Sequence, residues 1–215
     1  MCKCYLGFFV IMFFSGCAGK SPFIYEDNSS SNLKADGPSI AIQYIIDKRT
    51  GDTDIDESFE TDPLIDMSNI LKNEIESTGY FSNVYLIEEN SSYLNTDHFY
   101  IIRPYLINMK WEIPNYEDMI GNLMFISLIT GGLGGIIYGS TETDVLGDVS
   151  LNIVMENKYS GHVLIDKQYN GHSKKSYSKF VSDSNFKKSR VIGYAFSEIM
   201  SKLKSDIKQA SIANY

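Results

Sequence analysis

The sequence predicts an α+β fold, an α/β sandwich in which two helices cover one face of a mixed sheet of about five strands. Two stretches, residues 98–113 and 148–156, alternate apolar and polar side chains, which is the pattern of strands with one buried face. Two others, after Asp62 and after Ser184, repeat apolar residues at helical spacing. The expected order of elements is β-α-β-β-(apolar insert)-β-β-α.

The first part of the domain is expected to form a strand, a helix and a second strand. Residues 40–46 are rich in isoleucine and predict a buried strand. Asp62 and Pro63 predict the start of a helix, because the carboxylate can cap the first turn and proline is tolerated at its first position. Gly79 predicts the end of this helix, and residues 84–87 predict the next strand.

The third strand is expected to bury one row of side chains. This row is interrupted only by Arg103, which we expect to pair with an acidic residue. The row contains Phe99, Ile101, Tyr105, Ile107, Met109, Trp111 and Ile113. Residues 149–169 predict a β-hairpin with a turn at 157–161. Ser184 fits the N-cap of the last helix, whose apolar stripe consists of Ile192, Ala195, Phe196, Ile199, Leu203 and Ile207.

The composition indicates one globular domain that does not bind nucleic acid. The chain has 215 residues, 43% of them hydrophobic, and includes 15 Tyr and 12 Phe, which supports a sizeable core. Its net charge of −8 argues against nucleic-acid binding, which depends on neutralising phosphates. All three cysteines lie within the first 17 residues, so neither a disulfide framework nor a zinc–thiolate site is expected in the rest.

Residues 1–16 have the layout of a lipoprotein signal peptide. An apolar run from Tyr5 to Phe14 is too short to span a bilayer, and small residues follow it. The alternatives are an ordinary signal peptide that is cleaved nearby and a fortuitous apolar start. A signal peptide of either kind would be absent from the mature protein.

The residues Phe14, Ser15, Gly16 and Cys17 resemble the lipobox of bacterial lipoproteins, in which the signal is cleaved before the cysteine. The resemblance implies that Cys17 carries acyl chains such as palmitate and becomes the first residue of the mature protein. Each buried CH₂ of an acyl chain contributes about 0.8 kcal/mol, so several chains hold a protein firmly on a membrane. Ala18 differs from the aspartate that is associated with inner-membrane retention. The resemblance therefore implies the outer membrane, with the domain facing the periplasm.

The rest of the chain divides into a tether, one domain and a short tail. Residues 17–38 contain the lipidated cysteine and a polar, serine-rich stretch that predicts a flexible tether. Residues 39–208 are expected to form the single α/β domain, with an apolar, glycine-rich insert at 115–143. Residues 209–215 are expected to be a C-terminal tail.

The insert has no charged residue from Met119 to Thr141, a length that could nominally span a bilayer. Gly131, Gly135 and Gly139 would form one smooth stripe on a helix. Three interpretations stay open: a helix-turn-helix packed on its own domain, with the glycine cluster as the turn; a surface that docks a partner or another copy; or insertion into the outer membrane. The candidate membrane or partner contacts are Leu123, Phe125, Ile126, Leu128, Ile129, Gly131, Gly135, Ile136, Ile137 and Gly139.

No residue pattern predicts a catalytic, metal or cofactor site. Asp52, Asp54 and Asp56 belong to an acidic loop, residues 47–62, that lacks the glycine and the bidentate glutamate of a calcium-binding loop. Whether this loop binds Ca²⁺ adventitiously stays open. The three histidines lack the spacing of a metal-binding helix, and no nucleophile or dinucleotide motif is present. We therefore expect a protein that is not an enzyme and needs no cofactor.

Short motifs add a resemblance to a group of bacterial envelope lipoproteins. The motifs are Ser15-Gly16-Cys17, Thr78-Gly79-Tyr80-Phe81 and the stretch Asn157–Ile165. Together with the order of elements, they resemble the curli secretion channel and the exopolysaccharide-export lipoprotein, which have an anticodon-binding-like α/β domain. The resemblance implies a non-catalytic assembly or accessory subunit of an envelope complex that serves secretion, transport or surface-structure biogenesis.

The same resemblance implies partners. Several relatives form rings, so self-association or an envelope protein complex is expected in addition to the membrane, with no nucleic acid and no identified small-molecule substrate. Two alternatives remain. One is a ring-forming pore subunit at the outer membrane. The other is a small-ligand-binding periplasmic domain with a pocket near Arg103, Trp111 and the acidic loop.

Overall fold

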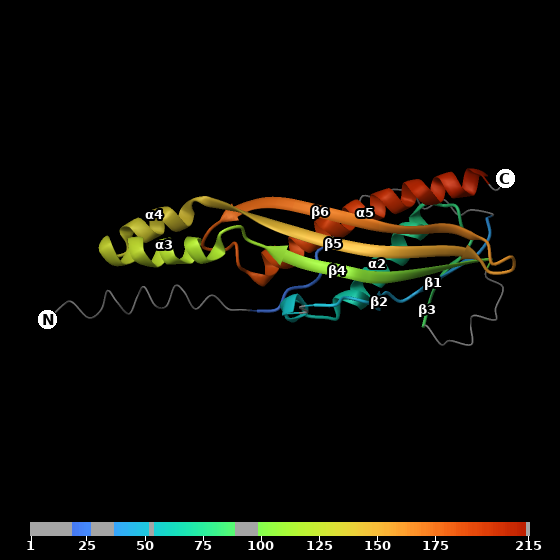
Figure 1. Cartoon of the computed structure of the whole chain (residues 1–215), viewed down its shortest axis with the longest axis horizontal. Coiled ribbons are helices and arrows are strands. Elements are labelled where there is room, and N and C mark those ends of the chain that lie inside the picture. The colour runs from blue at the N-terminus through green and yellow to red at the C-terminus, as the bar shows by residue number, and fades with distance from the viewer. Residues whose placement is uncertain (1–18, 27–36, 52–53, 89–98, 214–215) are drawn as a thin grey trace.

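The computed structural model describes residues 19–26, 37–51, 54–88 and 99–213. They form an elongated α+β body in which helices α2 and α5 cover one face of a mixed sheet, as the sequence predicts (Figure 1). The strands are β1 (Ile40–Gln43), β2 (Ile46–Asp47), β3 (Val84–Ile87), β4 (Tyr100–Glu112), β5 (Glu142–Asn157) and β6 (Val163–Ser178). The helices are the 3-10 helix η1 (Asp54–Ser58), α2 (Pro63–Ser77), α3 (Tyr116–Ile129), α4 (Leu133–Ser140) and α5 (Asn185–Ala213).

The sheet has a parallel half and an antiparallel half. Its order is β3-β1-β4-β5-β6, and β2 also pairs with β4. β1 runs parallel to both β3 and β4, and α2 supplies the crossover from β1 to β3. β4, β5 and β6 are antiparallel, and β5 and β6 form the predicted hairpin. Asn157 closes its turn, because its Oδ1 accepts hydrogen bonds from the backbone N–H groups of Tyr159 and Ser160, both at 3.0 Å.

Helix α2 begins and ends where the sequence predicts. The Asp62 carboxylate accepts a hydrogen bond of 2.8 Å from the N–H of Leu64, and Pro63 opens the helix. Gly79 follows the C-cap with a φ of 69°, a left-handed conformation that favours glycine. The strand expected at 40–46 is interrupted between β1 and β2. There the N–H of Ile45 donates to the hydroxyl of Ser68 on α2, at 2.9 Å, instead of to a neighbouring strand.

The prediction that the third strand buries a single row of apolar residues is wrong, because β4 contains a bulge. Its pairing with β5 shifts between Leu106 and Asn108. The extra residue, Ile107, moves the buried row from even to odd positions, so that Ile102, Leu106 and Met109 all belong to the main core. Arg103 therefore lies on the opposite face of the sheet. There it pairs with Glu156 at 2.7 Å, as expected for a structural ion pair.

The C-terminal helix confirms the predicted apolar stripe. All six of its residues, from Ile192 to Ile207, are at most 1% exposed. The helix lies directly on β6, since a Cβ at Gly171 would be 1.8 Å from the carbonyl oxygen of Ala195. α5 begins immediately after Ser184 and continues to Ala213, so residues 209–213 extend the helix where a tail was expected.

The first described residues pack on the body, in contrast to the flexible tether expected over residues 17–38. The N–H of Ser21 donates to the carbonyl of Ser58 at 2.9 Å, and Ser21 forms a β-bridge with Phe59. Phe23 and Tyr25 meet the ring of Phe196 on α5 at centroid distances of 6.1 and 6.0 Å. These two aromatic rings explain the packing, because they bury apolar surface that a free tether would leave in water. The rest of the expected tether, apart from residues 37 and 38, lies outside the described residues.

Candidate functional site

The apolar insert forms a helical hairpin that projects from one end of the body (Figure 1). α3 and α4 pack side by side, because a Cβ at Gly135 would lie only 1.7 Å from the hydroxyl oxygen of Ser127. Gly131 and Gly132 form the turn with φ angles of 62° and 100°, which favour glycine. The backbone is thus the helix-turn-helix of the first interpretation. The expected stripe of three glycines is absent, because Gly131 lies in the turn, whereas Gly135 and Gly139 lie on α4.

The base of the hairpin is attached to the body by a small core of its own. This core consists of Ile113, Met119, Val145 and Val191. The segment that follows β6 returns to the same place, where the N–H of Lys179 donates to the carbonyl of Thr141 at 2.9 Å. The hydroxyl of Tyr116 donates to Asp183 Oδ2 at 2.8 Å. Burial of the Tyr116 ring and this contact with Asp183 raise the pKa of the tyrosine to about 12.

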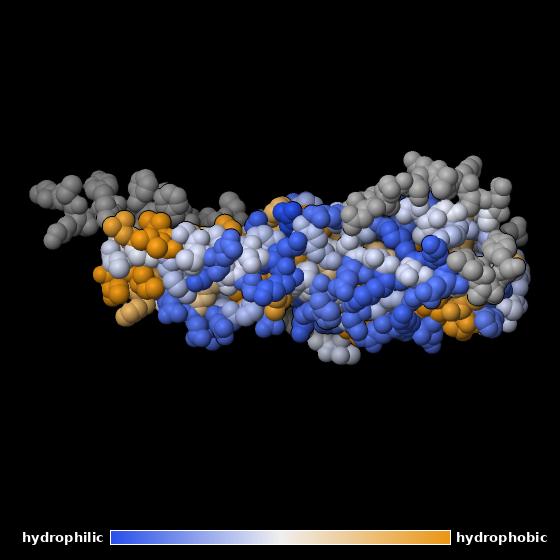
Figure 2. Space-filling view, turned by 90° about the horizontal axis from the view of Figure 1, so that it is seen from above, coloured by the Kyte–Doolittle hydropathy of each residue, from blue (hydrophilic) through white to orange (hydrophobic). Residues whose placement is uncertain are grey.

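The far end of the hairpin exposes a cluster of large apolar side chains. They are Met124, Phe125, Leu128, Ile129, Leu133, Ile136 and Ile137, which we call the apolar tip. Each is between 60% and 83% exposed. Figure 2 shows hydrophobic surface gathered at this end of the molecule, whereas most of the remaining visible surface is polar. Monomeric soluble proteins rarely leave such a contiguous patch in water, so the apolar tip is the main candidate for a functional contact.

The structure separates the predicted contact residues into two groups. Phe125, Leu128, Ile129, Ile136 and Ile137 belong to the apolar tip, Gly131 is exposed in the turn, and Ile126 is half-buried. Leu123, Gly135 and Gly139 are buried and face the interior of the hairpin or its base. The interpretation of a hairpin packed on its own domain therefore applies to the base but not to the tip.

Sequence reasoning missed two members of the apolar tip, Met124 and Leu133. Both lie within the stretch that has no charged residue, which is the only signal that could have indicated them. Helical periodicity could not, because α3 is apolar around most of its circumference and has no single apolar face.

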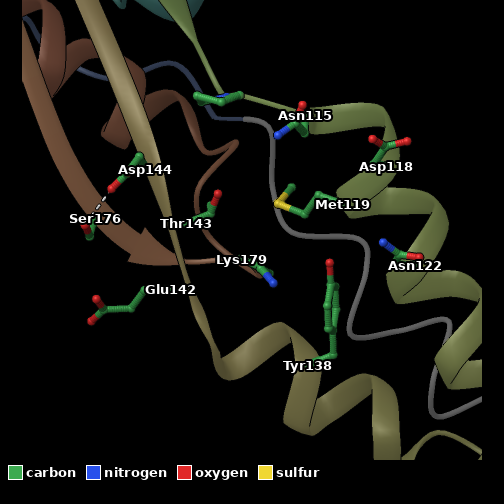
Figure 3. Close-up of a pocket in the computed structure, with 11 residues that line it drawn as sticks. Asn115, Asp118, Met119, Asn122, Tyr138, Glu142, Thr143, Asp144, Ser176 and Lys179 are labelled. Carbon is green, nitrogen blue, oxygen red and sulfur yellow. Dashed lines mark hydrogen bonds between the residues drawn. The ribbon is translucent and has the colours of Figure 1, made fainter.

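A polar cleft of about 620 Å³ lies at the base of the hairpin, between the start of α3, the end of α4, the start of β5 and the end of β6 (Figure 3). In this view Lys179 points toward Tyr138, and its Nζ lies 3.7 Å from the centroid of the ring. Asp144 accepts a hydrogen bond of 2.8 Å from Ser176 and pairs with Lys174 at 2.8 Å. These two contacts lower the pKa of Asp144 below its usual value, and the contact with Lys174 has the larger effect. Two of the lining charges are thus engaged by neighbours: Asp144 by Ser176 and Lys174, and Lys179 by the ring of Tyr138.

The alternative ligand site near Arg103, Trp111 and the acidic loop is not assembled. Arg103 lies on the open face of the sheet, whereas Trp111 lies on the covered face, where Lys188 of α5 sits 4.1 Å from its ring centroid. Within the acidic loop, Arg49 forms ion pairs with Asp47 and with Asp56, each at 2.7 Å. The hydrogen bond from Arg49 lowers the pKa of Asp47.

The histidines and the predicted lipidation motif give no further site among the described residues. His162 lies exposed in the turn between β5 and β6, and the Nδ1 of His172 contacts Asp148 on β5 at 2.5 Å. His98, Asp52 and the motif from Phe14 to Cys17 lie outside the described residues. Within the described ranges, no group of three or more His, Cys, Asp or Glu side chains could hold a metal ion. No helix in this part of the chain has the length and apolar character needed to cross a membrane.

No protein-family model matches this chain, and no curated protein matches it. Solved structures do resemble it. A homolog of neuraminyllactose-binding hemagglutinin from Helicobacter pylori has a TM-score of 0.55 at 9% identity, over 91% of this chain and 98% of that one. Protein XCC0632 from Xanthomonas campestris has a TM-score of 0.54 at 6% identity, over 92% and 99%. At these identities, the likeness shows that the fold is shared.

Bacterial lipoproteins are also among the structural neighbours. Lipoprotein GNA1162 from Neisseria meningitidis has a TM-score of 0.38 at 10% identity, over 83% of this chain and all of that one.

Proposed function

We propose that this chain is an outer-membrane lipoprotein, acylated on Cys17, whose domain faces the periplasm. It serves there as a non-catalytic assembly or accessory subunit of an envelope complex. The observation that carries the proposal is the run Phe14-Ser15-Gly16-Cys17 behind an apolar segment. The cysteine is four residues before Ser21, which makes the first backbone–backbone hydrogen bond to the body among the described residues. A lipid on Cys17 would therefore hold the folded body close to the membrane.

The arrangement of the surface supports a role in contacts rather than in catalysis. In the cleft at the hairpin base, Asp144 is engaged by Ser176 and Lys174, and Lys179 lies over the ring of Tyr138, so neither charge is held ready for a reacting atom. The most prominent surface feature is the apolar tip, which offers area for a contact but no reactive group. The open face of the sheet carries paired polar groups such as Arg103 with Glu156.

Lipidation is tested by replacing the cysteine in the native host, with an alkyne analogue of palmitate as the label. Cys17→Ser should lose the label and leave the membrane fraction, because no other cysteine belongs to the mature chain. Cys4→Ser is the matched control, since it lies in the predicted signal and should change neither result. Continued membrane attachment of unlabelled Cys17→Ser would contradict the proposal.

The choice of membrane has its own test. On a density gradient, the wild-type protein should follow outer-membrane vesicles, and Ala18→Asp should move it toward the inner membrane. A wild-type protein that follows the inner membrane would contradict the assignment to the outer membrane.

Participation in a complex is tested by chemical crosslinking in intact cells. A reproducible set of higher-mass adducts that contain this chain is expected, and a ladder of its own multiples would identify the ring-forming form of the proposal. Only the monomer at every crosslinker concentration would contradict an assembly role.

A further inference from the structure

We propose that the apolar tip inserts into the lipid layer of the membrane that holds Cys17, so that the protein is attached at two points. The inference rests on the proposed lipidation and adds a second contact to it. Its consequence is orientation: an acyl group alone allows the body to swivel, whereas a second contact fixes which end faces the bilayer.

The contacts of the residues that follow Cys17 place the membrane at the hairpin end of the body. Ser21 is the first described residue with a backbone–backbone hydrogen bond to the body, and the four residues back to Cys17 span at most about 14 Å. The side-chain amide of Asn185, at the start of α5, donates to the carbonyl of Gly19 at 3.3 Å. The other end of this 29-residue helix is about 43 Å away. Cys17 therefore cannot reach that far end.

The same end of α5 is joined to the base of the hairpin. In the segment between β6 and α5, the N–H of Phe180 donates to the carbonyl of Gly139 on α4, at 3.2 Å. Figure 1 shows the hairpin extending beyond the start of α5, away from the C-terminus. A bilayer within reach of Cys17 is thus on the side to which the apolar tip points.

The dimensions of the tip fit insertion into one leaflet. The exposed part of α3, from Met124 to Ile129, is about 9 Å long. Helices that lie in the membrane interface bury their apolar side chains to a depth of about 5–10 Å. No charged residue occurs between Met119 and Thr141, so this depth is reached without burying a charge.

The backbone of the turn is also suited to lipid, where an unsatisfied N–H group is costly. The N–H of Thr130 donates to Ile126 at 3.1 Å, and the N–H of Gly132 donates to Ser127 at 2.8 Å. The N–H of Gly134 donates to the hydroxyl of Thr130 at 2.8 Å. That hydroxyl in turn donates to the carbonyl of Ile126 at 2.6 Å. The hairpin thus turns back with these polar groups already bonded to one another.

Aromatic rings and lysines surround the base of the hairpin, as they do at the boundary between lipid and water in membrane proteins. Lys179 lies over the ring of Tyr138, and Lys187 lies over those of Tyr177 and Phe186 at 4.5 and 4.8 Å. A long lysine side chain can cover apolar surface and still keep its charge in the headgroup layer. The depth at which these residues lie would limit how far the hairpin enters.

The inference is tested on the lipidated full chain in vesicles of phosphatidylethanolamine and phosphatidylglycerol. The mature chain has no cysteine other than the acylated Cys17, so Leu128→Cys supplies a single reactive thiol for an environment-sensitive fluorophore. The label should be quenched by lipids that carry a nitroxide on their acyl chains and should be protected from aqueous iodide. Ser205→Cys, on the exposed side of α5 toward its far end, is the control and should behave in the opposite way.

A second variant tests whether the tip itself drives insertion. Phe125→Asp combined with Ile137→Asp, in the labelled Leu128→Cys background, should reduce quenching by the lipid nitroxides to the level of the Ser205→Cys control, because each charge opposes entry into lipid. Ile65→Asp is the matched control, since Ile65 is an exposed apolar residue on α2 outside the tip. It should leave the quenching unchanged.

The outcomes separate this inference from the proposed function. If the protein floats with the vesicles while the label at residue 128 stays open to iodide, the inference is wrong and the lipid anchor stands. Protection from both quenchers, together with crosslinks between labelled tips, would assign the tip to a second copy and also overturn it. If the wild-type protein carries no acyl chain and does not float, the proposed function itself fails.

Discussion

Helix α5 and the α3–α4 hairpin bury their apolar side chains to very different extents. α5 is a mixed helix, in which lysine, serine and carboxylate residues alternate with apolar ones, and its six predicted stripe residues are almost completely buried. The hairpin has no charge from Met119 to Thr141, yet it exposes seven large apolar side chains. The more apolar of the two elements is therefore the less buried.

The difference comes from periodicity rather than composition. The apolar residues of α5 recur at three- and four-residue spacing and fall on one face, which the sheet can cover completely. Apolar residues in the hairpin occur around both helices, and only the faces at the base and between the helices have a partner among the described residues. A helix that is apolar on all sides needs a second apolar environment, which the domain does not supply.

The largest expected effect is a loss of stability on α5, and an equal loss at the apolar tip would contradict the comparison of the two regions. Leu203→Ala, on the buried stripe of α5, should lower the free energy of unfolding by about 2–5 kcal/mol, because it leaves a cavity under the helix. Leu128→Ala, at the apolar tip, should change it by less than about 0.5 kcal/mol, because the side chain is 83% exposed. Urea unfolding followed by the fluorescence of Trp111, the only tryptophan, measures both. Similar losses for the two variants would show that the tip packs on the body.

A pair of glycines sharpens the comparison at the level of the backbone. Gly171→Ala should destabilise the protein by about 1–3 kcal/mol, because its Cβ would collide with the carbonyl oxygen of Ala195 and push α5 off β6. Gly121→Ala, on α3, has no atom within 4 Å of the new Cβ and should stabilise the protein by up to about 1 kcal/mol. The same urea measurement distinguishes them by the sign of the change. A loss of stability in Gly121→Ala would mean that this side of α3 is covered.

The elements that follow local rules could be predicted from the sequence. The start of α2 depends on Asp62 and Pro63, which act on their own first turn, and its end depends on Gly79. The stripe of α5 follows from helical spacing alone, and the turn of the β5–β6 hairpin is centred where its polar residues predict.

The features that depend on distant residues could not be predicted in this way. The bulge at Ile107 reverses the buried row of β4, and it is defined by the pairing with β5, more than forty positions later in the sequence. The packing of Phe23 and Tyr25 depends on Phe196, which no local pattern connects to them. The apolar character of the hairpin was evident, but which of its residues face outward depends on how α3 and α4 pack at Gly135.

The smallest expected effect concerns the attachment of the hairpin base. Tyr116→Phe removes the hydrogen bond to Asp183, so it should lower the stability slightly at neutral pH. The pKa of Tyr116 is raised to about 12 by burial and by Asp183, whereas an unfolded tyrosine titrates near 10. The folded state therefore favours the neutral phenol, and this contribution is complete below pH 10 and is lost as the pH rises to about 12. The urea midpoints of wild type and variant should accordingly converge over that interval. Because both proteins share every other tyrosine, a constant difference between them would mean that the Tyr116 hydroxyl does not help to hold the hairpin to the body.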